Sequence, residues 1–406
     1  MMHQELVENR RWISEHRFLH ALNYTMVLPG PEAQQLATYI GWLMYGVSGG
    51  LVAGTLFVLP SLFILVGLTW IYLEYGDVSY VHGVLYGIKP AVTAIVVFAA
   101  YRIGSKALSN NILRAIALLA FFAIFVLNIA FPYIVIGAGF IGFIGAKLTP
   151  DTFTLSGHGT NSKASYGLAI IDNDTPTPSH AVFSWLRLVT YALVGVGIGI
   201  VVMGLISNPV LQDMAEFFTK AAMVTFGGAY AVLPYVYQGG VEQYGWLTAT
   251  EMIDGLALGE TTPGPLIMVV AFVGFVGAVT KDIFGADATL ISGLAGAAVA
   301  TFFTFLPSFM FIFLGGPGVE ATRGNLKFSA PLSAVTAAVV GVILNLAVFF
   351  AQAVLWPNHG NEFDWIAAII GIVAFVALFR YKVGIMSVIA ASATGGLIIS
   401  VISPVI

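Results

Sequence analysis

Long apolar segments recur along this chain and constrain its fold more than any other feature. Ala115–Phe131 and Leu188–Ile206 contain no charged residue, and each approaches or reaches the roughly 20 residues that a helix needs to cross hydrocarbon. Hydrophobic residues make up 58% of the sequence and charged residues only 9%. A soluble protein cannot bury that much apolar surface, whereas a bilayer can accommodate it. The sequence therefore predicts an all-α polytopic membrane protein embedded in a lipid bilayer.

About 12 membrane segments are expected, and a Pro-Gly-Pro sequence interrupts two of them. They are placed at about 18–47 (interrupted), 49–75, 83–103, 110–131, 132–148, 181–206, 212–238, 250–279 (interrupted), 289–316, 329–354, 363–380 and 383–403.

The chain contains an internal repeat. Residues 234 apart match in order, and two further pairs of short sequences match after an insertion in the second half. The matches are Val7, Glu8 and Trp12 with Val241, Glu242 and Trp246; Pro29-Gly30-Pro31 with Pro263-Gly264-Pro265; "FVLPS" (57–61) with "TFLPS" (304–308); and "AVTAIVV" (91–97) with "AVTAAVV" (334–340).

These matches divide the chain into a first repeat (1–148) and a second repeat (207–406). A polar, turn-rich stretch at 149–180 is typical of an aqueous linker, and 181–206 is expected to be a single connecting transmembrane helix. One extra crossing between two equal repeats turns the second repeat upside down, so we predict two inverted-topology repeats.

The two Pro-Gly-Pro sequences predict broken helices. Proline lacks an amide donor and clashes with the preceding turn, and broken backbone at membrane depth is tolerated only inside protein or beside a wet cavity. After Gly30 and Gly264 a helix can restart, with Pro31 and Pro265 at its favoured first position. Free amides and the positive end of the helix dipole would then form an anion site. The alternative is a plain proline kink.

A Phe-Gly-Gly stretch at 226–228 lies 20 residues before Trp246. Gly227 and Gly228 permit a close backbone approach or a left-handed turn, although small residues also favour ordinary helix packing in membranes. We expect this stretch to help build the same cavity as the second Pro-Gly-Pro.

Three kinds of polar side chain, Glu, Lys and Thr, are candidates for a role at this site. Glu260 is expected to couple protonation to substrate binding, because an ionised carboxylate repels an anion. Glu32 fits either coupling or simple complementation of the helix dipole. Lys89 would supply a counter-charge if it faces the cavity, or would extend to the membrane boundary. The hydroxyls of Thr25, Thr261 and Thr262 could donate to substrate oxygens or bond back to their own helices.

Several functions find no support in the sequence. The absence of Cys excludes disulfides and thiolate sites, and a net charge of −4 does not indicate a nucleic-acid partner. The histidines lack metal-ligand spacing, and no catalytic triad or phosphate-binding loop is present. We expect no enzyme activity, metal or cofactor.

Two regions resemble the chromate ion transporter (CHR) family. "NRRWISEHRFLHALNYTMVLPGPEAQQLATYIGW" is similar to the family's first-half signature, and "VTFGGAYAVLPYV" with "GLALGETTPGPLIMVVAFVGF" is similar to its second-half signature. The resemblance covers almost the whole chain. It implies a long, two-domain, multi-pass protein of the inner (plasma) membrane that exports chromate and confers chromate resistance.

Substrate choice and assembly stay open at this point. Sulfate has the shape and charge of chromate, so a sulfate-like oxyanion is an alternative substrate or competitor, and a homodimer is one arrangement open to the chain. The alternative of another class is a membrane-embedded enzyme acting on a phosphorylated lipid, whose phosphate the same amides would hold.

The first repeat has no Phe-Gly-Gly stretch, although the family resemblance implies one in each half. Its counterpart would fall before Met1, so the first repeat is expected to lack its first membrane element. We predict an in-frame upstream extension that supplies it. Without that element, one wall of the first-half cavity should be open and the amides of the first-half break uncovered.

Overall fold

The computed structural model describes residues 2–76, 78–148, 167–172, 174–226, 228–322, 329–357 and 362–402. Within these ranges the chain is helical, and the only other regular element is an isolated bridge between Ile13 and Ile171. The first part contains η1 (Gln4–Asn9), α1 (Glu15–Val27), α2 (Glu32–Tyr75), α3 (Ser79–Ala107), α4 (Asn111–Phe125) and α5 (Phe131–Leu148). Then follow α6 (Trp185–Leu205), α7 (Pro209–Val224), α8 (Ala229–Tyr237), η3 (Gln238–Gln243), α9 (Ala249–Thr261), η4 (Leu266–Met268) and α10 (Val269–Thr280). The last elements are η5 (Ala286–Ala288), α11 (Thr289–Thr322), α12 (Ser329–Leu355), α13 (Trp365–Phe379) and α14 (Ile385–Ile402).

Seven of these helices are long and apolar enough to cross a membrane, namely α2, α3, α5, α6, α11, α12 and α14. Three shorter apolar helices, α4, η4–α10 and α13, account for further predicted segments. The all-α, polytopic membrane class is thereby confirmed. The two interrupted segments are the pairs α1–α2 and α9–α10, each separated by Pro-Gly-Pro.

Helix α2 is a hairpin of two arms. Tyr45 and Gly46 have non-helical dihedral angles, and a Cβ placed on Gly41 would lie only 2.5 Å from the carbonyl oxygen of Gly49. Residues eight apart in a straight helix would be separated by about 12 Å, so the chain reverses at Tyr45–Gly46. This bend lies where the sequence predicted the end of one membrane segment.

The second half contains the same hairpin as two separate helices. There α10 packs along α11, and a Cβ on Gly274 would meet the carbonyl of Gly296. Upstream, η1 and η3 are both six-residue π-helices and α1 and α9 both have 13 residues, and each pair is offset by the predicted 234 residues. These correspondences agree with the internal repeat. The division at 1–148 and 207–406 and the inverted relation of the two repeats remain proposals.

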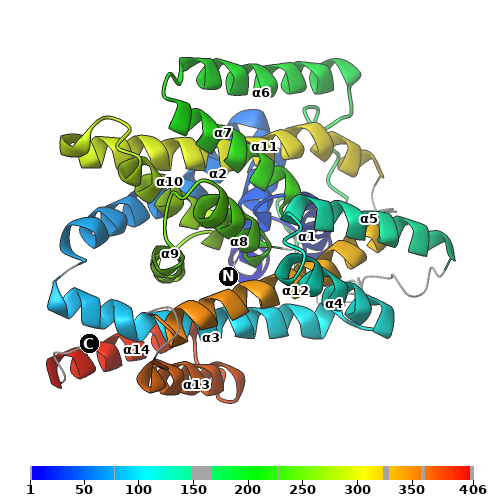
Figure 1. Cartoon of the computed structure of the whole chain (residues 1–406). Coiled ribbons are helices and arrows are strands. Elements are labelled where there is room, and N and C mark those ends of the chain that lie inside the picture. Colours follow the sequence, from blue (N-terminus) through cyan, green and yellow to red (C-terminus); the bar gives the residue numbers. More distant parts are fainter. Residues whose placement is uncertain are drawn as a thin grey trace.

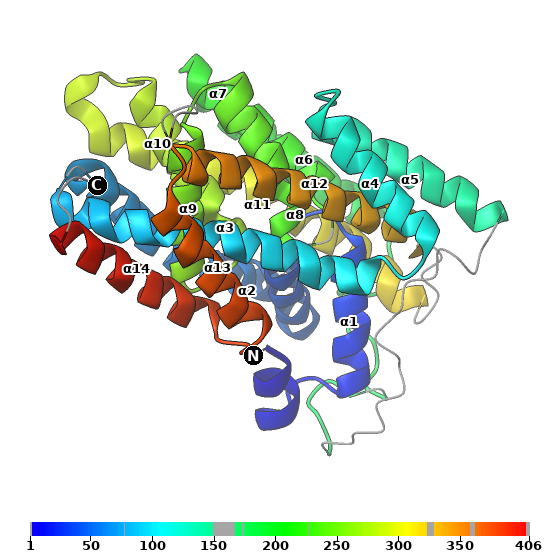
Figure 2. The same cartoon turned by 60° about the horizontal axis from the view of Figure 1, so that its bottom comes forward.

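Helices α3 and α12 run side by side through the molecule (Figures 1 and 2). On one side α13 and α14 pack against α3, and toward the other end α4 and α5 pack against α12. Close approach is provided by small residues, because a Cβ on Gly87 of α3 would lie 2.8 Å from the Cα of Gly396 on α14. Such packing, rather than exclusion from water, holds helices together in lipid.

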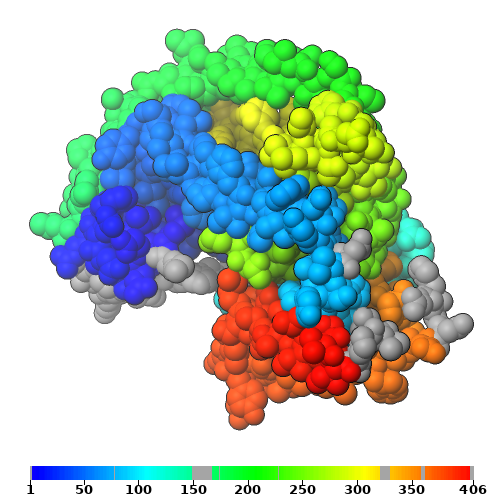
Figure 3. Space-filling model, turned by 90° about the vertical axis from the view of Figure 1, so that its left-hand side faces the viewer, coloured from blue at the N-terminus to red at the C-terminus, as the bar shows by residue number. Residues whose placement is uncertain are grey.

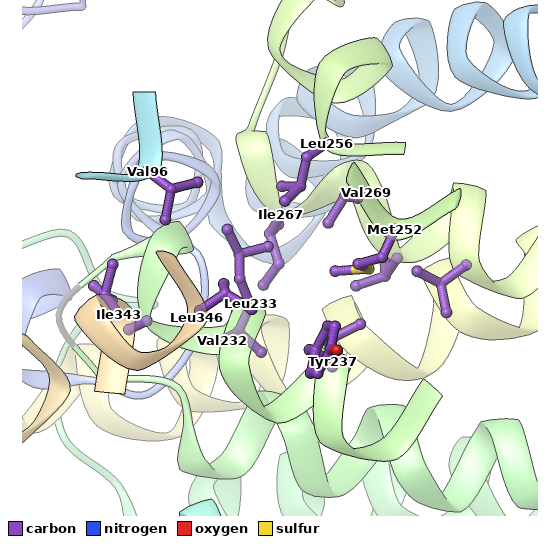
Figure 4. Close-up of a cluster of buried hydrophobic side chains, with 14 of the residues drawn as sticks. Val96, Val232, Leu233, Tyr237, Met252, Leu256, Ile267, Val269, Ile343 and Leu346 are labelled. Atoms are coloured by element: carbon purple, nitrogen blue, oxygen red, sulfur yellow. The ribbon is translucent and has the colours of Figure 1, made fainter. Parts of the chain in front are cut away.

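Short helices α8 and α9 lie at the centre of this frame (Figure 1). Their apolar side chains, together with side chains of α12 and η4, form a buried cluster (Figure 4) that fixes the second Pro-Gly-Pro turn in place. Its members include Val232 and Leu233 of α8, Met252 and Leu256 of α9, Ile267 of η4, and Ile343 and Leu346 of α12.

The connecting helix α6 lies on the outside, against α11 (Figure 1). The apolar side chains of its membrane-spanning stretch are not buried inside the chain, as expected for a helix surrounded by lipid. Most of the predicted linker, 149–166 and Asn173, lies outside the described residues. Its last part is not a free spacer, because Ile171 hydrogen-bonds the backbone at Trp12 and Ser14.

Candidate functional site at the two broken helices

Both Pro-Gly-Pro sequences form tight turns between two helices. Gly30 has a φ of 114° and Gly264 a φ of 132°, a region of backbone conformation that essentially only glycine occupies without strain. The turns therefore require glycine. They interrupt the helices as the sequence predicted.

Each turn packs against the opposite half of the molecule. A Cβ on Gly30 would lie 2.6 Å from Oγ of Ser308 on α11, and a Cβ on Gly264 would lie 2.7 Å from Cβ of Ser61 on α2. Ser61 and Ser308 end the matching "FVLPS" and "TFLPS" sequences, and both are buried. The two breaks thus share one crossed arrangement. The repeat alignment contained these serines, but nothing in it indicated that they cross over.

The break between α7 and α8 lies between the two turns. The carbonyl of Thr225 accepts a 2.8 Å hydrogen bond from the amide of Gly30, and the Tyr230 hydroxyl donates to the Glu260 carboxylate. Helix α8 also packs on η4, directly after the second turn. Gly228 begins α8 with a φ of 98°, whereas Gly227 lies outside the described residues.

The two turns differ in their exposure. Gly30 is buried and its amide is satisfied by Thr225, while Pro263 and Gly264 are exposed. Among the described residues, no hydrogen bond from the Gly264 amide is found, and the neighbouring Ser61 hydroxyl makes none either. The expectation that the first-half amides lack cover is therefore wrong, because the element that covers Gly30 comes from the second half.

The predicted threonines bond to their own helices. The Thr25 hydroxyl donates to the Leu22 carbonyl at 2.9 Å, and the hydroxyls of Thr261 and Thr262 donate to the Leu258 carbonyl at 2.9 and 2.7 Å. This is the second of the two alternatives that the sequence left open. A role as substrate ligands stays a prediction for all three.

Lys89 lies away from the turns. Its ammonium nitrogen is 3.5 Å from Oδ2 of Asp254, which also accepts a 3.0 Å hydrogen bond from the Tyr72 hydroxyl. Asp254 precedes Gly264 by ten residues, and helix α9 ends between them at Thr261. Lys89 therefore neutralises a buried carboxylate, and its role as a counter-charge at the second turn stays a prediction. An aspartate inside an apolar segment was the signal that could have identified Asp254.

A second buried ion pair joins the two halves. Nη1 of Arg17 lies 2.5 Å from Oε2 of Glu320, whose other oxygen accepts a hydrogen bond from Tyr39. Arg17 also donates to the carbonyls of Asp172 and Thr175 in the linker. The pair ties α1 to the end of α11 and to the linker. Sequence reasoning did not identify it.

Glu32 is the first residue of α2 and is partly buried. This is the position in which a carboxylate complements the helix dipole. The side chain of Gln35 donates to the Pro29 carbonyl at 2.7 Å and braces the same turn.

An apolar cavity of about 720 Å³ lies between η1 and the two arms of α2. Phe57 lines one end of this cavity, and its carbonyl oxygen would be 3.8 Å from a Cβ on Gly264. The residues that line the cavity belong to η1, α2 and their neighbours, and none belongs to the second turn. In the described part of the chain, no cluster of His, Asp and Glu could hold a metal ion.

The fold and the site define a class of protein. It is a multi-pass membrane protein whose paired broken helices meet inside it, as in secondary transporters. The chain belongs to the chromate transporter family, whose model matches residues 1–143 and 212–397. The order of the matched regions agrees with the two proposed repeats. Membership of a transporter family favours transport over the phospholipid enzyme considered above.

Curated relatives cover nearly the whole chain. A chromate transport protein of Pseudomonas aeruginosa is 33% identical over 401 residues, 98% of this chain and 86% of the relative. A chromate transport protein of Cupriavidus metallidurans is 28% identical over 94% of this chain and 82% of its own. A probable chromate transport protein of Synechococcus elongatus is 28% identical over 93% of this chain and 84% of its own. No solved structure matches the chain.

Proposed function

We propose that this protein transports chromate across the inner (plasma) membrane, exporting it from the cytoplasm and so conferring chromate resistance. Membership of the chromate transporter family is the observation that carries the proposal, and the names of the relatives give the substrate. Sulfate has the same shape and charge and is proposed as a competitor.

We place the oxyanion at the Gly264–Pro265 turn. The Gly264 amide and the Ser61 hydroxyl supply neutral donors without protein acceptors among the described residues, and the start of η4–α10 adds the positive end of a helix dipole. Glycine is needed there because a side chain would occupy the space next to Ser61. Gly228, Thr261 and Thr262 border this turn in the chain or through α8.

The Gly30–Pro31 turn is proposed as the matching position in a second state of the carrier. In the described conformation the Thr225 carbonyl occupies its amide, so an oxyanion can bind there only after that hydrogen bond opens. In a carrier built from repeats, closing one of two related turns while the other opens is one way to give the substrate access from alternate sides of the membrane.

The test is chromate flux through the purified protein in lipid vesicles. Vesicles loaded with labelled chromate should lose it faster than protein-free vesicles, and external or internal sulfate should slow the loss. As a matched control, Glu216→Gln changes an exposed carboxylate of α7 that pairs with Lys220 and should leave the flux unchanged. Equal loss from protein-containing and protein-free vesicles would remove the proposed function.

A further inference from the structure

Asp254 is a buried carboxylate to which the transport site gives no role. Its side chain is 2% exposed and lies where α9 meets α2 and α3. Oδ2 has two partners, Tyr72 and Lys89, but Oδ1 is buried and makes no hydrogen bond with the described residues. A buried carboxylate oxygen without a donor is costly in a low-dielectric interior. Such groups inside membranes usually take part in ion or proton movement.

Few other charged groups face Asp254. Helix α3 contributes Lys89 and α2 contributes Tyr72, while Glu251 on α9 itself adds a like charge. The other elements packed against α9 are α10, α12, α14 and η4, and their sequences contain no Asp, Glu, His, Lys, Arg or Tyr. The charge of this cluster is therefore set mainly by the pair Asp254 and Lys89.

We propose that Asp254 binds and releases one proton in each transport cycle, with Lys89 and Tyr72 holding its carboxylate in place. This inference rests on the proposed oxyanion transport and assigns its coupling ion. The proton comes from water on one side of the membrane, adds to Oδ1 and leaves to water on the other side. Lys89 keeps its charge throughout.

Glu260 is a poorer candidate for this role, although the sequence favoured it. The Tyr230 hydroxyl donates to Glu260, and Glu260 is only partly buried. Its charge thus has both a donor and some access to the surroundings. Oδ1 of Asp254 has neither a hydrogen-bond donor among the described residues nor access to the surroundings.

Proton and oxyanion binding should favour each other. When Asp254 is protonated, the positive charge of Lys89 is no longer cancelled, and a dianion at the second turn is stabilised by it across a medium of low dielectric. By linkage, a bound oxyanion must then favour protonation to the same extent. Chromate binding should therefore tighten as the pH falls, and protons should move together with the anion.

The experiment measures chromate flux and proton flux in the same vesicles, with a pH-sensitive dye on one side. In the wild-type protein we expect about one proton for each chromate moved, and in Asp254→Asn a ratio of about zero with chromate flux still present. The substrate's own protonation is the same in both proteins, so their difference isolates the protein's proton. Glu216→Gln serves as the control for a carboxylate-to-amide change.

Each outcome decides one question. Wild-type protein that moves no chromate removes the proposed function itself. If the wild-type protein moves both chromate and protons, and Asp254→Asn has the same proton-to-chromate ratio, the role of Asp254 is overturned. The role is overturned as well if Glu260→Gln loses the proton flux and Asp254→Asn keeps it. If Asp254→Asn fails to fold because Lys89 is left unpaired, the double variant Lys89→Gln/Asp254→Asn removes both charges and carries the same prediction.

Discussion

The helical hairpins that follow η1 and η3 are built alike but are covered differently. In the second half, α7 packs against α11, and Phe217 and Phe218 contact Trp246 with ring centroids 5.4 and 5.9 Å apart. In the first half, Trp12, Gly41 and Gly49 belong to the matching face and line the cavity between η1 and α2. Figure 3 shows first-half segments (blue) on the outer surface of the molecule. That the first half lacks a membrane element stays a prediction.

The Gly30 turn is covered by a residue from the opposite half of the molecule. Thr225, which follows α7 in the second half, closes the Gly30 turn of the first half. The Gly264 turn of the second half is exposed and lies next to Phe57 and Ser61 of the first half. A substitution in one repeat should therefore alter the Pro-Gly-Pro turn of the other repeat.

The largest contrast is expected between Gly264→Ala and Gly30→Ala. Both place a Cβ in a left-handed conformation, at a cost of about 1–3 kcal/mol. At the exposed Gly264 turn the new methyl group crowds Ser61 and the free amide, so we expect an inserted, folded protein with most of its chromate flux lost. At the buried Gly30 turn it meets Ser308 and Gln35, so the yield of folded protein should fall as well.

Flux in vesicles and the thermal midpoint in detergent separate these two effects. The larger variant Gly264→Val should abolish flux altogether while still inserting. Normal flux in Gly264→Ala, at normal expression, would mean that the second break is only a kink. Equal thermal midpoints for both alanine variants would contradict the distinction between a closed turn and an open one.

The next contrast concerns the equivalent tryptophans. Trp246 is 1% exposed and stacks on Tyr244 with ring centroids 4.5 Å apart, while Trp12 lies at the edge of the cavity. Truncating a fully buried Trp to Ala costs about 3–5 kcal/mol, and we expect Trp12→Ala to cost less than half of that. Chemical or thermal unfolding in detergent measures both. Equal losses would mean that the first-half cavity is filled in the membrane.

Sequence reasoning predicted the membrane class, most of the helical segments and the two Pro-Gly-Pro breaks because each depends on local pattern. The predicted single segment at 212–238 was wrong, since the chain divides it into α7 and α8. Hydrophobic length gives the helices, and proline with glycine gives the turns. The partners across the turns could not be predicted in this way. The contacts of Gly30 with Ser308 and of Gly264 with Ser61 join residues that are far apart in sequence and depend on how the halves pack.

The charged residues show the same limit. Lys89 was a candidate counter-charge or a membrane-boundary cation, and its partner Asp254 was not among the candidate residues. Only packing of α9 on α3 brings the two within 3.5 Å. The coupling role predicted for Glu260 and Glu32 remains to be measured.

The smallest contrast is expected between the two crossed serines. The Ser308 hydroxyl is buried without a hydrogen bond among the described residues, so Ser308→Ala removes an unsatisfied polar group and should leave flux unchanged or raise the thermal midpoint slightly. The Ser61 hydroxyl lies beside the open Gly264 turn, where we propose that it donates to the oxyanion. Loss of one such bond costs about 1 kcal/mol, which is about a fivefold rise in the chromate concentration for half-maximal flux. Ser61→Thr keeps the hydroxyl and should lose less than Ser61→Ala. If the concentration dependence of Ser61→Ala matches that of Ser308→Ala, the oxyanion does not bind at the exposed turn, and the two turns are equal in function despite their different cover.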